Sequence, residues 1–302
     1  MQKLNVVYIG NCSEEFSKVL DSFNEDMSSV VCVCDSDIKR GLICVEKYLC
    51  SFVEDYHVLL SRTNVDLAVI ESCGVLRSAE IRAAAEAGKN LFVILDESTL
   101  MQVGEVEKVV KKAQEEQGIR ATFVTVDELD NDFWSNLPFR REDLGRLLNV
   151  VVELPSRAPG SVSMNRNAYD AVRTIYELLG APVNCTGIRG RMADDLFTGA
   201  AMYRYADGAI ASILVGGGVR AHSVCLYGDQ GCAFINREST QYRLKEGDWQ
   251  NQDIESQRRR TRKPTYELLQ SIMNDDHRAI SHSLEEVIAT GRMLCSILKP
   301  ET

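Results

Sequence analysis

Apolar residues over the first 126 positions form short continuous runs, separated by stretches in which they recur at helical spacing. Short apolar runs between turn signals are typical of buried strands, and the spaced stretches are typical of helices that bury one face. The predicted strands have the sequences LNVVYIG, SVVCVCD, VDLAVIES, NLFVILD and RATFVTVD. Near-continuous apolar strands alternating with helices predict a parallel sheet covered on both faces, an α/β, doubly wound, Rossmann-like domain over residues 1–126.

The helices of this first half are predicted by where their apolar residues fall and where they stop. Phe16, Val19, Leu20 and Phe23 lie at helical spacing, and GLICVEKYLCSF predicts a helix that continues through Phe52. The stretches SAEIRAAAEAGK, closed by a glycine, and VGEVEKVVKKAQEEQG predict two more helices. SRTN predicts a turn before the third strand.

The rhythm changes from about residue 145 onward. GRLLNVVVELPS reads as a strand and NAYDAVRTIYELLGAP as a helix stopped by glycine and proline. The strands AAMYRYA, AIASILVG, HSVCLYG, CAFIN and TQYRLKEG follow, and then two helices end the chain. Asp207-Gly208 and the GDQG at 228–231 are hairpin signals. This pattern predicts that residues 127–302 form a C-terminal α+β domain with an open, mostly antiparallel sheet and helices on one face.

Composition and charge exclude several classes of protein. The chain has 302 residues, a net charge of −10 and a pI near 5.1, which disfavours nucleic acid and acidic membranes as partners. No apolar run is long enough to span a membrane, and Met1 leads at once into a strand, so we expect no signal peptide. The ten cysteines form no CxxC pair and show no metal-ligand spacing with the four histidines. We expect reduced thiols, no metal site and a cytoplasmic location.

Several stretches resemble the Gfo/Idh/MocA oxidoreductases, the family of glucose–fructose oxidoreductase and inositol dehydrogenase. VDLAVIESCGVLRSAEIRAAAEAGKN looks like the family's third strand, loop and helix ending in Ala-Gly-Lys, and LGRLLNVVVE is similar to its domain-crossing strand. YDAVRTIYELLGAPV resembles its first C-terminal helix, and YRYADGAIASILVGG and LYGDQGCAFIN resemble its sheet strands. The resemblance covers nearly the whole chain. It implies NAD or NADP as cofactor and a sugar, a polyol or a similar alcohol as substrate.

The resemblance places the family's cofactor-binding glycines at Gly10, Cys12 and Glu15, so only the first is kept. Ser13 is a plausible N-cap for the following helix, and Glu14 with Glu15 supplies negative charge where a pyrophosphate would bind. One cofactor-binding feature of the family is still present. Asp35 ends the second strand, where a carboxylate hydrogen-bonds to the ribose hydroxyls and favours NAD over NADP. An alternative is that Asp35 simply caps the next helix.

The catalytic residues that the family implies are also changed. Its Glu-Lys-Pro triplet falls at Ile94, Leu95 and Asp96, so the lysine position holds a leucine, with Asp96 as a candidate replacement. The Thr-Pro of the third-strand loop is matched by Ser72 and Cys73.

In the C-terminal half the Asp-x-Gly-x-His-x-x-Asp pattern is best matched by Asn165, Asn167, Tyr169 and Val172. Tyr169 is a candidate acid, or else a tyrosine packed under the sheet. Asn165, Tyr169 and His222 are the candidate substrate-pocket residues.

Two functions follow from these residues. The first is an NAD(P)-dependent oxidoreductase of a sugar, polyol or similar alcohol. The second is a non-catalytic relative that binds a sugar-like ligand, regulates or acts as a partner subunit, with the possibility that no dinucleotide binds at all. The joint change of glycines, lysine and histidine favours the loss of chemistry. In either case we expect a homodimer or larger, formed through an apolar face of the C-terminal sheet.

Overall fold

The computed structural model divides the chain into two compact units. The first comprises Met1–Asn131 together with Arg260–Ile288, and the second comprises Asp132–Arg259 together with Ala289–Thr302. The residues that the structure describes are 3–11, 14–24, 26–125, 139–155, 161–191, 197–217, 219, 222–236, 239–245, 247–253, 264–274 and 283–298.

The first unit is built on a six-stranded parallel sheet in the order β3-β2-β1-β4-β5-β6. Its strands are β1 (Leu4–Ile9), β2 (Ser28–Cys34), β3 (Ser51–Val53), β4 (Leu67–Ser72), β5 (Asn90–Leu95) and β6 (Ala121–Thr125). The order reverses between β1 and β4, which is the doubly wound arrangement expected from the alternation of apolar runs and helices. The predicted parallel, Rossmann-like sheet is confirmed.

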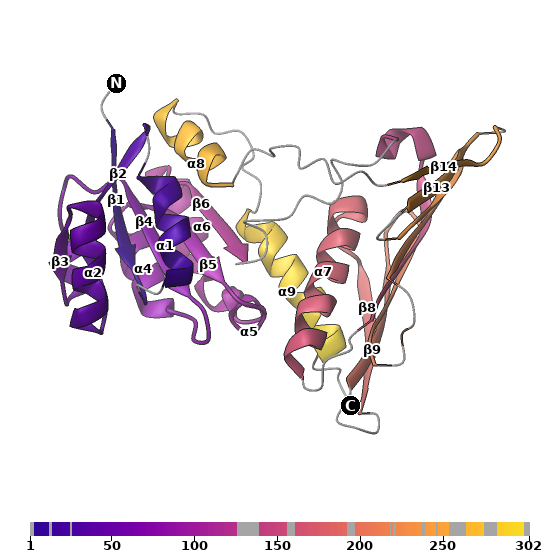
Figure 1. Ribbon diagram of the computed structural model, residues 1–302, viewed down its shortest axis with the longest axis horizontal. Helices are drawn as coiled ribbons and strands as arrows, with labels where there is room; N and C mark the ends of the chain where they lie inside the picture. Colours follow the sequence, from indigo (N-terminus) through magenta and orange to yellow (C-terminus); the bar gives the residue numbers. More distant parts are fainter. Residues whose placement is uncertain are drawn as a thin grey trace. The chain divides into compact units, whose positions relative to one another are not determined.

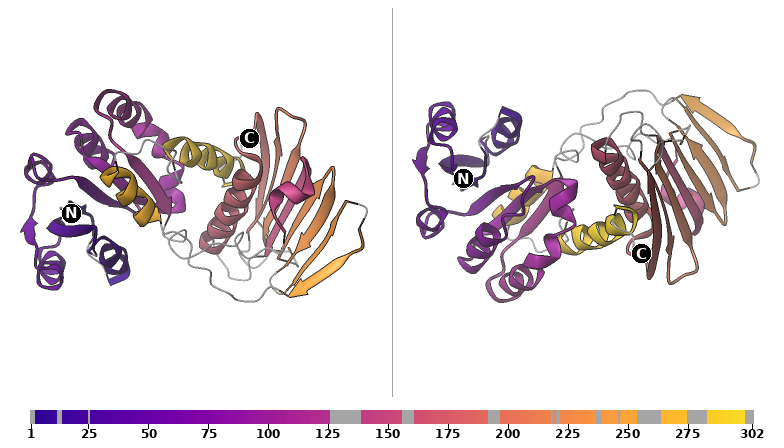
Figure 2. Two further views of the ribbon diagram at one scale, coloured as in Figure 1. Left: turned by 90° about the horizontal axis from the view of Figure 1, so that it is seen from above. Right: turned by 90° about the horizontal axis from the view of Figure 1, so that it is seen from below.

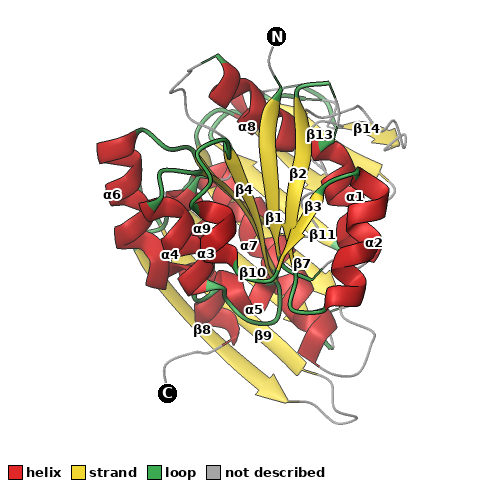
Figure 3. Ribbon diagram, turned by 90° about the vertical axis from the view of Figure 1, so that its left-hand side faces the viewer, coloured by secondary structure: helices red, strands yellow, loops and turns green. Residues whose placement is uncertain are grey.

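Helices cover both faces of this sheet (Figure 3). α1 (Glu14–Phe23) and α2 (Ile38–Tyr48) lie on one side, while α4 (Ser78–Glu86) and α6 (Glu107–Gln117) pack together on the other. The short elements are α3 (Tyr56–Leu60), α5 (Glu97–Leu100) and the 3-10 turn η1 (Val103–Val106). Every residue of β4 and β6 is buried, which explains why their sequences are apolar runs rather than alternating patterns.

A late segment of the chain completes the core of the first unit. α8 (Pro264–Met273) packs against β6, and its Leu268 and Leu269 join a buried cluster with Leu20 and Phe23 of α1. Phe23 meets Phe92 of β5 edge to face, with ring centroids 5.0 Å apart. The parallel sheet is therefore covered on the α1 face by residues from both ends of the sequence.

One predicted helix is shorter than expected. The apolar spacing of GLICVEKYLCSF predicted a helix through Phe52, but α2 stops at Tyr48 because Leu49 adopts the left-handed conformation, with φ of 53°. The next residues turn back along β2 and form β3, with Val33 opposite Phe52. This edge strand is too short to show a period in the sequence.

The second unit is built on an eight-stranded, mostly antiparallel sheet in the order β14-β13-β12-β11-β7-β10-β9-β8. Its strands are β7 (Leu147–Pro155), β8 (Asn184–Arg191), β9 (Phe197–Arg204), β10 (Ile210–Gly216), β11 (Ser223–Gly228), β12 (Gly231–Ile235), β13 (Ser239–Leu244) and β14 (Gln250–Asp253). Only the β7–β10 pair is parallel. The hairpins expected at Asp207-Gly208 and at GDQG join β9 to β10 and β11 to β12. The open sheet is confirmed.

α7 (Ser161–Leu179) and the part of α9 (Leu284–Leu298) from Ala289 onward lie along one face of the second unit's sheet (Figures 1 and 2). α7 packs on β7, β9 and β10, and α9 reaches Tyr203, whose hydroxyl donates to the Met293 carbonyl at 3.0 Å. Within the described residues no helix covers the other face, where Met202 is 51% exposed. A 3-10 turn, η4 (Arg141–Leu144), leads into β7. Of the helices that the structure describes, none combines the length and apolar character needed to cross a bilayer.

The two outer strands, β8 and β14, are not predicted from the sequence. Both are edge strands, and their sequences NCTGIRGR and QNQD carry few apolar residues because one flank of each has no partner strand. A strand whose side chains are largely exposed leaves no alternation of apolar and polar residues.

Close packing of α9 on β8 predicts a strong effect at one glycine. A Cβ added at Gly187 would lie 1.9 Å from the Ser296 carbonyl oxygen, so we expect Gly187→Ala to lower the free energy of unfolding by about 1–3 kcal/mol. Gly190→Ala on the same strand is the matched control, because its Cβ would be 3.5 Å from the nearest heavy atom. Urea unfolding of both variants tests this, and equal stabilities would contradict it.

Candidate functional site

The first-unit residues singled out from the sequence lie at one edge of the parallel sheet. Gly10 follows β1, Asp35 follows β2, Ser72 ends β4 and Asp96 follows β5. Because parallel strands present their carboxyl ends at the same edge, the fold brings these positions together. Hydrogen bonds join neighbouring strand ends at this edge. The Gly10 N–H after β1 donates to the Cys34 carbonyl of β2 at 3.0 Å, and the Gly74 N–H after β4 donates to Asp96 Oδ2 after β5 at 2.5 Å.

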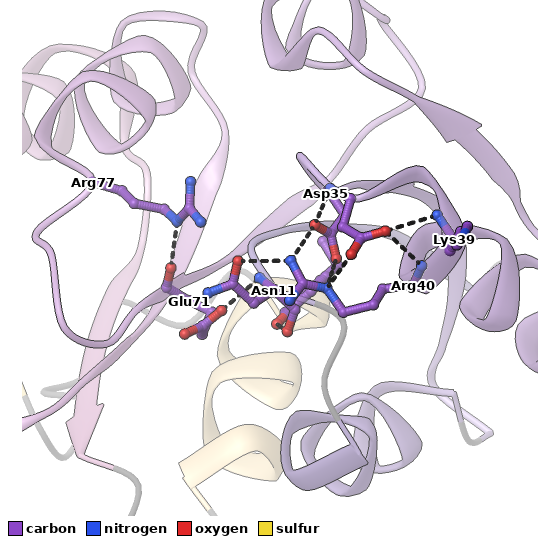
Figure 4. A network of polar contacts seen from close by, with 8 residues as sticks. Asn11, Asp35, Lys39, Arg40, Glu71 and Arg77 are labelled. Atoms are coloured by element: carbon purple, nitrogen blue, oxygen red, sulfur yellow. Dashed lines mark hydrogen bonds and ion pairs between the residues drawn. The ribbon is translucent and has the colours of Figure 1, made fainter.

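The carboxylate of Glu71, a residue of β4, contacts the loop that follows β1 (Figure 4). Its Oε2 accepts the Asn11 N–H at 2.6 Å, and only 2% of Glu71 is exposed. A Cβ added at Gly10 would lie 2.6 Å from Glu71 Cβ and 2.9 Å from Glu71 Oε2. Gly10 is therefore required here because the Glu71 side chain packs directly against its Cα.

Asn11 is the centre of the polar network at this edge. Its carbonyl oxygen accepts the Tyr8 hydroxyl at 3.0 Å, and its side-chain oxygen accepts Arg40 Nη2 at 3.4 Å. With the Glu71 contact, three groups of Asn11 are bound to other parts of the first unit. The loop after β1 is thus fixed from β1, α2 and β4 at once.

Asp35 is held by Arg40 and is fully buried at its side chain. Arg40 donates to both carboxylate oxygens, Nη2 to Oδ1 at 3.1 Å and Nε to Oδ2 at 3.3 Å, and the Asp37 N–H donates to Oδ1 at 2.7 Å. The alternative that Asp35 caps the next helix is wrong. The N-cap of α2 is Asp37, which accepts the backbone N–H groups of Lys39 and Arg40.

Glu71 is a buried carboxyl with an altered proton affinity. Burial raises the pKa of Glu71, while the hydrogen bond from Asn11 and the charge of Arg77 act in the opposite direction. Arg77 Nε donates to the backbone carbonyl of Glu71 at 2.8 Å, and its Nη1 donates to Glu80 at 3.2 Å. Glu71 Oε2 can accept the Asn11 N–H whether the carboxyl group is ionised or protonated.

At the lysine position suggested by the resemblance, the side chain is apolar and buried. Leu95 pairs with Ser72 in the sheet and is 0% exposed. Asp96 forms the N-cap of α5, where its side chain accepts the N–H groups of Ser98 and Thr99. Burial opposes ionisation of Asp96, but hydrogen bonds from Thr99, Ser98 and Gly74 outweigh it and lower the pKa of that carboxyl. Ser72 is buried and its Oγ accepts the Arg77 N–H at 3.1 Å.

Two of the predicted cofactor residues lie outside what the structure describes. Cys12 is not described, and neither is the side chain of Glu15 in α1. The residues missed by sequence reasoning are Glu71, Asn11 and Arg40. A signal for Glu71 was available, because it is an acidic residue at the end of the otherwise apolar strand VDLAVIES, and buried carboxylates are rare unless paired.

The second-unit candidates are placed on α7 and beside β11. Asn165 and Tyr169 lie one turn apart on α7, and His222 comes just before β11, the strand paired with β7. Tyr169 is 3% exposed. Asn165 Oδ1 is buried and has no hydrogen-bond partner within the described residues, which is the kind of group a polar ligand satisfies.

The described part of the chain contains no candidate metal site and no reactive thiol. It contains no group of three His, Cys, Asp or Glu side chains arranged to hold a metal ion. Its cysteines are free thiols. Burial raises the pKa of Cys34 and of Cys50 to about 11, so these thiols are protonated and unreactive at neutral pH.

Comparisons with known proteins match the fold described above. The model of an oxidoreductase family with an NAD-binding Rossmann fold, Gfo/Idh/MocA, matches residues 4–123. Among curated proteins, none matches the sequence.

Solved structures share the fold over nearly the whole chain. A dehydrogenase from Chromobacterium violaceum has a TM-score of 0.75 at 15% identity, covering 99% of this chain and 96% of its own. Biliverdin reductase from Synechocystis sp. PCC 6803, in complex with biliverdin and NADP+, has a TM-score of 0.71 at 13% identity, with coverages of 97% and 98%. Levoglucosan dehydrogenase, in complex with NADH and levoglucosan, has a TM-score of 0.71 at 14% identity, with coverages of 99% and 97%. At these identities the likeness shows the fold alone.

The raised pKa of Glu71 predicts a pH-dependent difference between the wild type and Glu71→Gln. A carboxyl whose pKa is raised on folding contributes stability that is complete below its ordinary value of 4.5 and is lost as the pH rises through the raised value. Glutamine can still accept the Asn11 N–H but does not titrate. We therefore expect the variant to gain stability relative to the wild type as the pH rises above 4.5.

Urea unfolding of both proteins across this pH range measures the difference. Glu86→Gln, at an exposed position on α4, is the control. A difference between wild type and Glu71→Gln that stays constant with pH would show that Glu71 does not titrate in this way.

Proposed function

Because the N-terminal domain of this chain belongs to the Gfo/Idh/MocA family of NAD(P)-binding oxidoreductases, we propose that the protein keeps the fold of a sugar or polyol dehydrogenase without its dinucleotide chemistry. It serves instead as a ligand-binding, regulatory or partner subunit. The observation that carries this proposal is the hydrogen bond from the Asn11 N–H to Glu71 Oε2.

Glu71 takes the place that a cofactor phosphate needs. A dinucleotide fold binds pyrophosphate on backbone N–H groups of the loop after the first strand, and the positive end of the following helix favours the negative charge. Here the first of these N–H groups that the structure describes, that of Asn11, is bound to an internal carboxyl oxygen at 2.6 Å. A phosphate oxygen would have to displace Glu71 from a site in which it is 2% exposed.

Electrostatics makes that displacement costly when Glu71 is ionised. Two unit negative charges about 4 Å apart repel by about 4 kcal/mol at an effective dielectric near 20. Glu14 and Glu15 are the first two residues of α1. The residues present therefore do not fit a bound pyrophosphate in this arrangement.

The carboxylate expected to bind the ribose is also bound to another side chain of the protein. Asp35, which favours NAD by its position, is bound through both carboxylate oxygens to Arg40. The Asp35 side chain is also fully buried, so a ribose hydroxyl could reach it only if the pairing with Arg40 opened. The position of Asp35 therefore carries no preference for NAD while this ion pair is closed.

The expected catalytic groups are placed for structure rather than for chemistry. Leu95 has no ionisable group that could donate a proton. Asp96 caps α5, and Tyr169 is buried in α7. Hydride transfer to a carbonyl needs a proton donor beside the reacting carbon as well as an oriented nicotinamide. Both requirements are unmet by these residues, which agrees with a protein that has kept its fold and lost the reaction.

An active oxidoreductase is the second candidate, and one observation is compatible with it. The unpartnered Asn165 Oδ1 on α7 is suited to bind a hydroxyl of a sugar-like molecule. In that case Tyr169 would be the acid and NAD or NADP the hydride carrier. A ligand pocket without hydride transfer explains the same amide, so Asn165 supports both candidates, while Glu71 supports the first alone.

Binding of NADH and NADPH separates the two candidates. We expect no saturable fluorescence change for either dinucleotide with the wild type at micromolar concentrations. Glu71→Ala removes the internal carboxyl, and we expect it to tighten binding by at least about tenfold, which corresponds to 1.4 kcal/mol. The double change Glu14→Gly with Glu15→Gly tests the contribution of the helix carboxylates in the same assay.

Glu80→Ala is the control for removal of a carboxylate near the site, because Glu80 lies on α4 and binds Arg77 rather than the loop. A micromolar dissociation constant for the wild type would overturn the proposed function. Tight binding by neither protein would leave the function standing and show that Glu71 is not what excludes the dinucleotide.

The uncovered face of the second sheet supports self-association. Ile188 is 70% exposed, Met202 is 51% exposed and Leu214 is 39% exposed, on neighbouring strands of the face without helices. Contiguous exposed apolar side chains of this kind mark interaction surfaces. We propose that two copies meet through this face.

A dimer or larger species is therefore expected by light scattering. Met202→Glu places a charge on β9 in the middle of this apolar group, and we expect it to yield a monomer. Val75→Glu, at an apolar residue of the first unit that is 75% exposed, is the matched control and should leave the mass unchanged. A monomeric wild type would contradict the proposed interface.

A further inference from the structure

A hollow in the second unit lies between the β11–β12 turn and the end of β13, and none of the candidate site residues lines it. Its volume is about 600 Å³, within the range of small-molecule sites. The residues that line it are Tyr227, Gly228, Asp229, Gln230, Gly231, Cys232, Arg243 and Lys245.

The side chains of the hollow form a row across three strands. Tyr227 of β11 is opposite Cys232 of β12, which is in turn opposite Arg243 of β13. Residues directly opposite each other on antiparallel strands project from the same face. The ring of Tyr227, the thiol of Cys232 and the guanidinium of Arg243 therefore lie side by side. The small thiol lies between the two larger groups.

The guanidinium of Arg243 is held in place by aromatic rings. Its Cζ lies 5.4 Å from the Trp249 ring centroid, and Trp249 stacks on Phe234 at 5.6 Å. Phe234 also meets Tyr227 edge to face at 5.7 Å. A guanidinium oriented by a ring keeps its planar fork of donors available for a carboxylate or a phosphate.

The rim of the hollow is fixed before any ligand binds. The Asp229 N–H donates to the Arg146 carbonyl at 3.0 Å, and the Arg146 N–H donates back to Asp229 Oδ1 at 2.9 Å. The Gln230 carbonyl accepts the N–H of Lys245, a residue in the left-handed conformation with φ of 53°. Such a conformation is rare for residues other than glycine and recurs at binding sites.

The charge of the hollow is opposite in sign to that of the protein. Arg243 and Lys245 supply two cations in a chain of net charge −10, and within the described part of the chain no carboxylate pairs with either. The one lining carboxylate, Asp229, is bound by a backbone amide at its Oδ1. The two cations are thus available to an external anion.

We propose that this hollow binds a small organic anion, in which a carboxylate or phosphate group is joined to a flat ring. The anion binds Arg243 and Lys245, and the ring lies against Tyr227 over Cys232. Aromatic rings favour the ring, the paired cations favour the anion, and the volume accommodates both. The site is independent of the dinucleotide loop and of the function proposed for it.

The fluorescence of Trp249 reports on binding when the other tryptophan, Trp134, is replaced by phenylalanine. The probes are phenyl phosphate and benzoate, with inorganic phosphate and benzyl alcohol as the separate halves of such a ligand. We expect a saturable change with phenyl phosphate or benzoate, and an affinity at least about tenfold weaker for each half alone. Which of the two ring-bearing anions binds more tightly identifies the anionic group.

Variants of the two cations test the assignment. We expect Arg243→Ala to weaken binding of the ring-bearing anion by at least about tenfold and Arg243→Lys to weaken it less, because lysine keeps the charge and loses the fork. Lys245→Ala, at a second exposed residue, should also weaken it. Arg204→Ala, an exposed arginine of β9 on the same sheet, should not. Calorimetry with each variant gives the affinity without relying on the tryptophan signal.

Three results would overturn the proposal. The first is equal affinity for inorganic phosphate and phenyl phosphate, which would indicate a simple anion contact. The second is equal affinity for benzyl alcohol, which would indicate a purely apolar surface. The third is binding that Arg243→Ala and Lys245→Ala leave unchanged, or no binding of any probe by the protein carrying Trp134→Phe.

Discussion

The hydrogen bond between Glu71 Oε2 and the Asn11 N–H is the contact around which the carboxyl edge of the first sheet is organised. It joins β4 to the loop after β1, requires glycine at position 10 and leaves Asn11 to bind Arg40, which in turn binds Asp35. Among the described residues of this edge, Asn11, Arg40 and Asp35 are each bound by another group of the same chain. A polar network of this kind is stable without a ligand, because its buried donors and acceptors have partners.

The same fold can hold a dinucleotide only if this network is absent or displaced. A Rossmann edge binds pyrophosphate through N–H groups that the protein leaves free, so their availability matters more than the sheet beneath them. Here the sheet, the reversal of strand order and the position of Asp35 are all kept. In the function proposed here, the feature that matters is the carboxyl group of Glu71 on β4, which accepts the loop amide of Asn11.

The second unit distributes its surface differently. Helices cover one face of the eight-stranded sheet, and the other face presents apolar residues on β8–β10 and aromatic and cationic residues on β11–β13. Apolar area left exposed favours association with another surface, whereas cations beside rings favour a small anion. The two ends of one sheet face are thus suited to different partners.

The sequence by itself determined the parallel sheet, the later antiparallel sheet and the hairpin turns, since apolar periodicity and turn residues are local properties of the chain. The resemblance that the sequence carries also places Leu95 at the family's lysine position, which stays a prediction. The edge strands β8 and β14 and the early end of α2 could not be predicted, because exposed strands and a left-handed Leu49 leave no periodic signal. Only the tertiary structure decided that Glu71 reaches Asn11 across 60 residues of sequence, and that Arg243 lies beside Tyr227. Both depend on which strands are neighbours, and strand order arises from packing of the whole sheet.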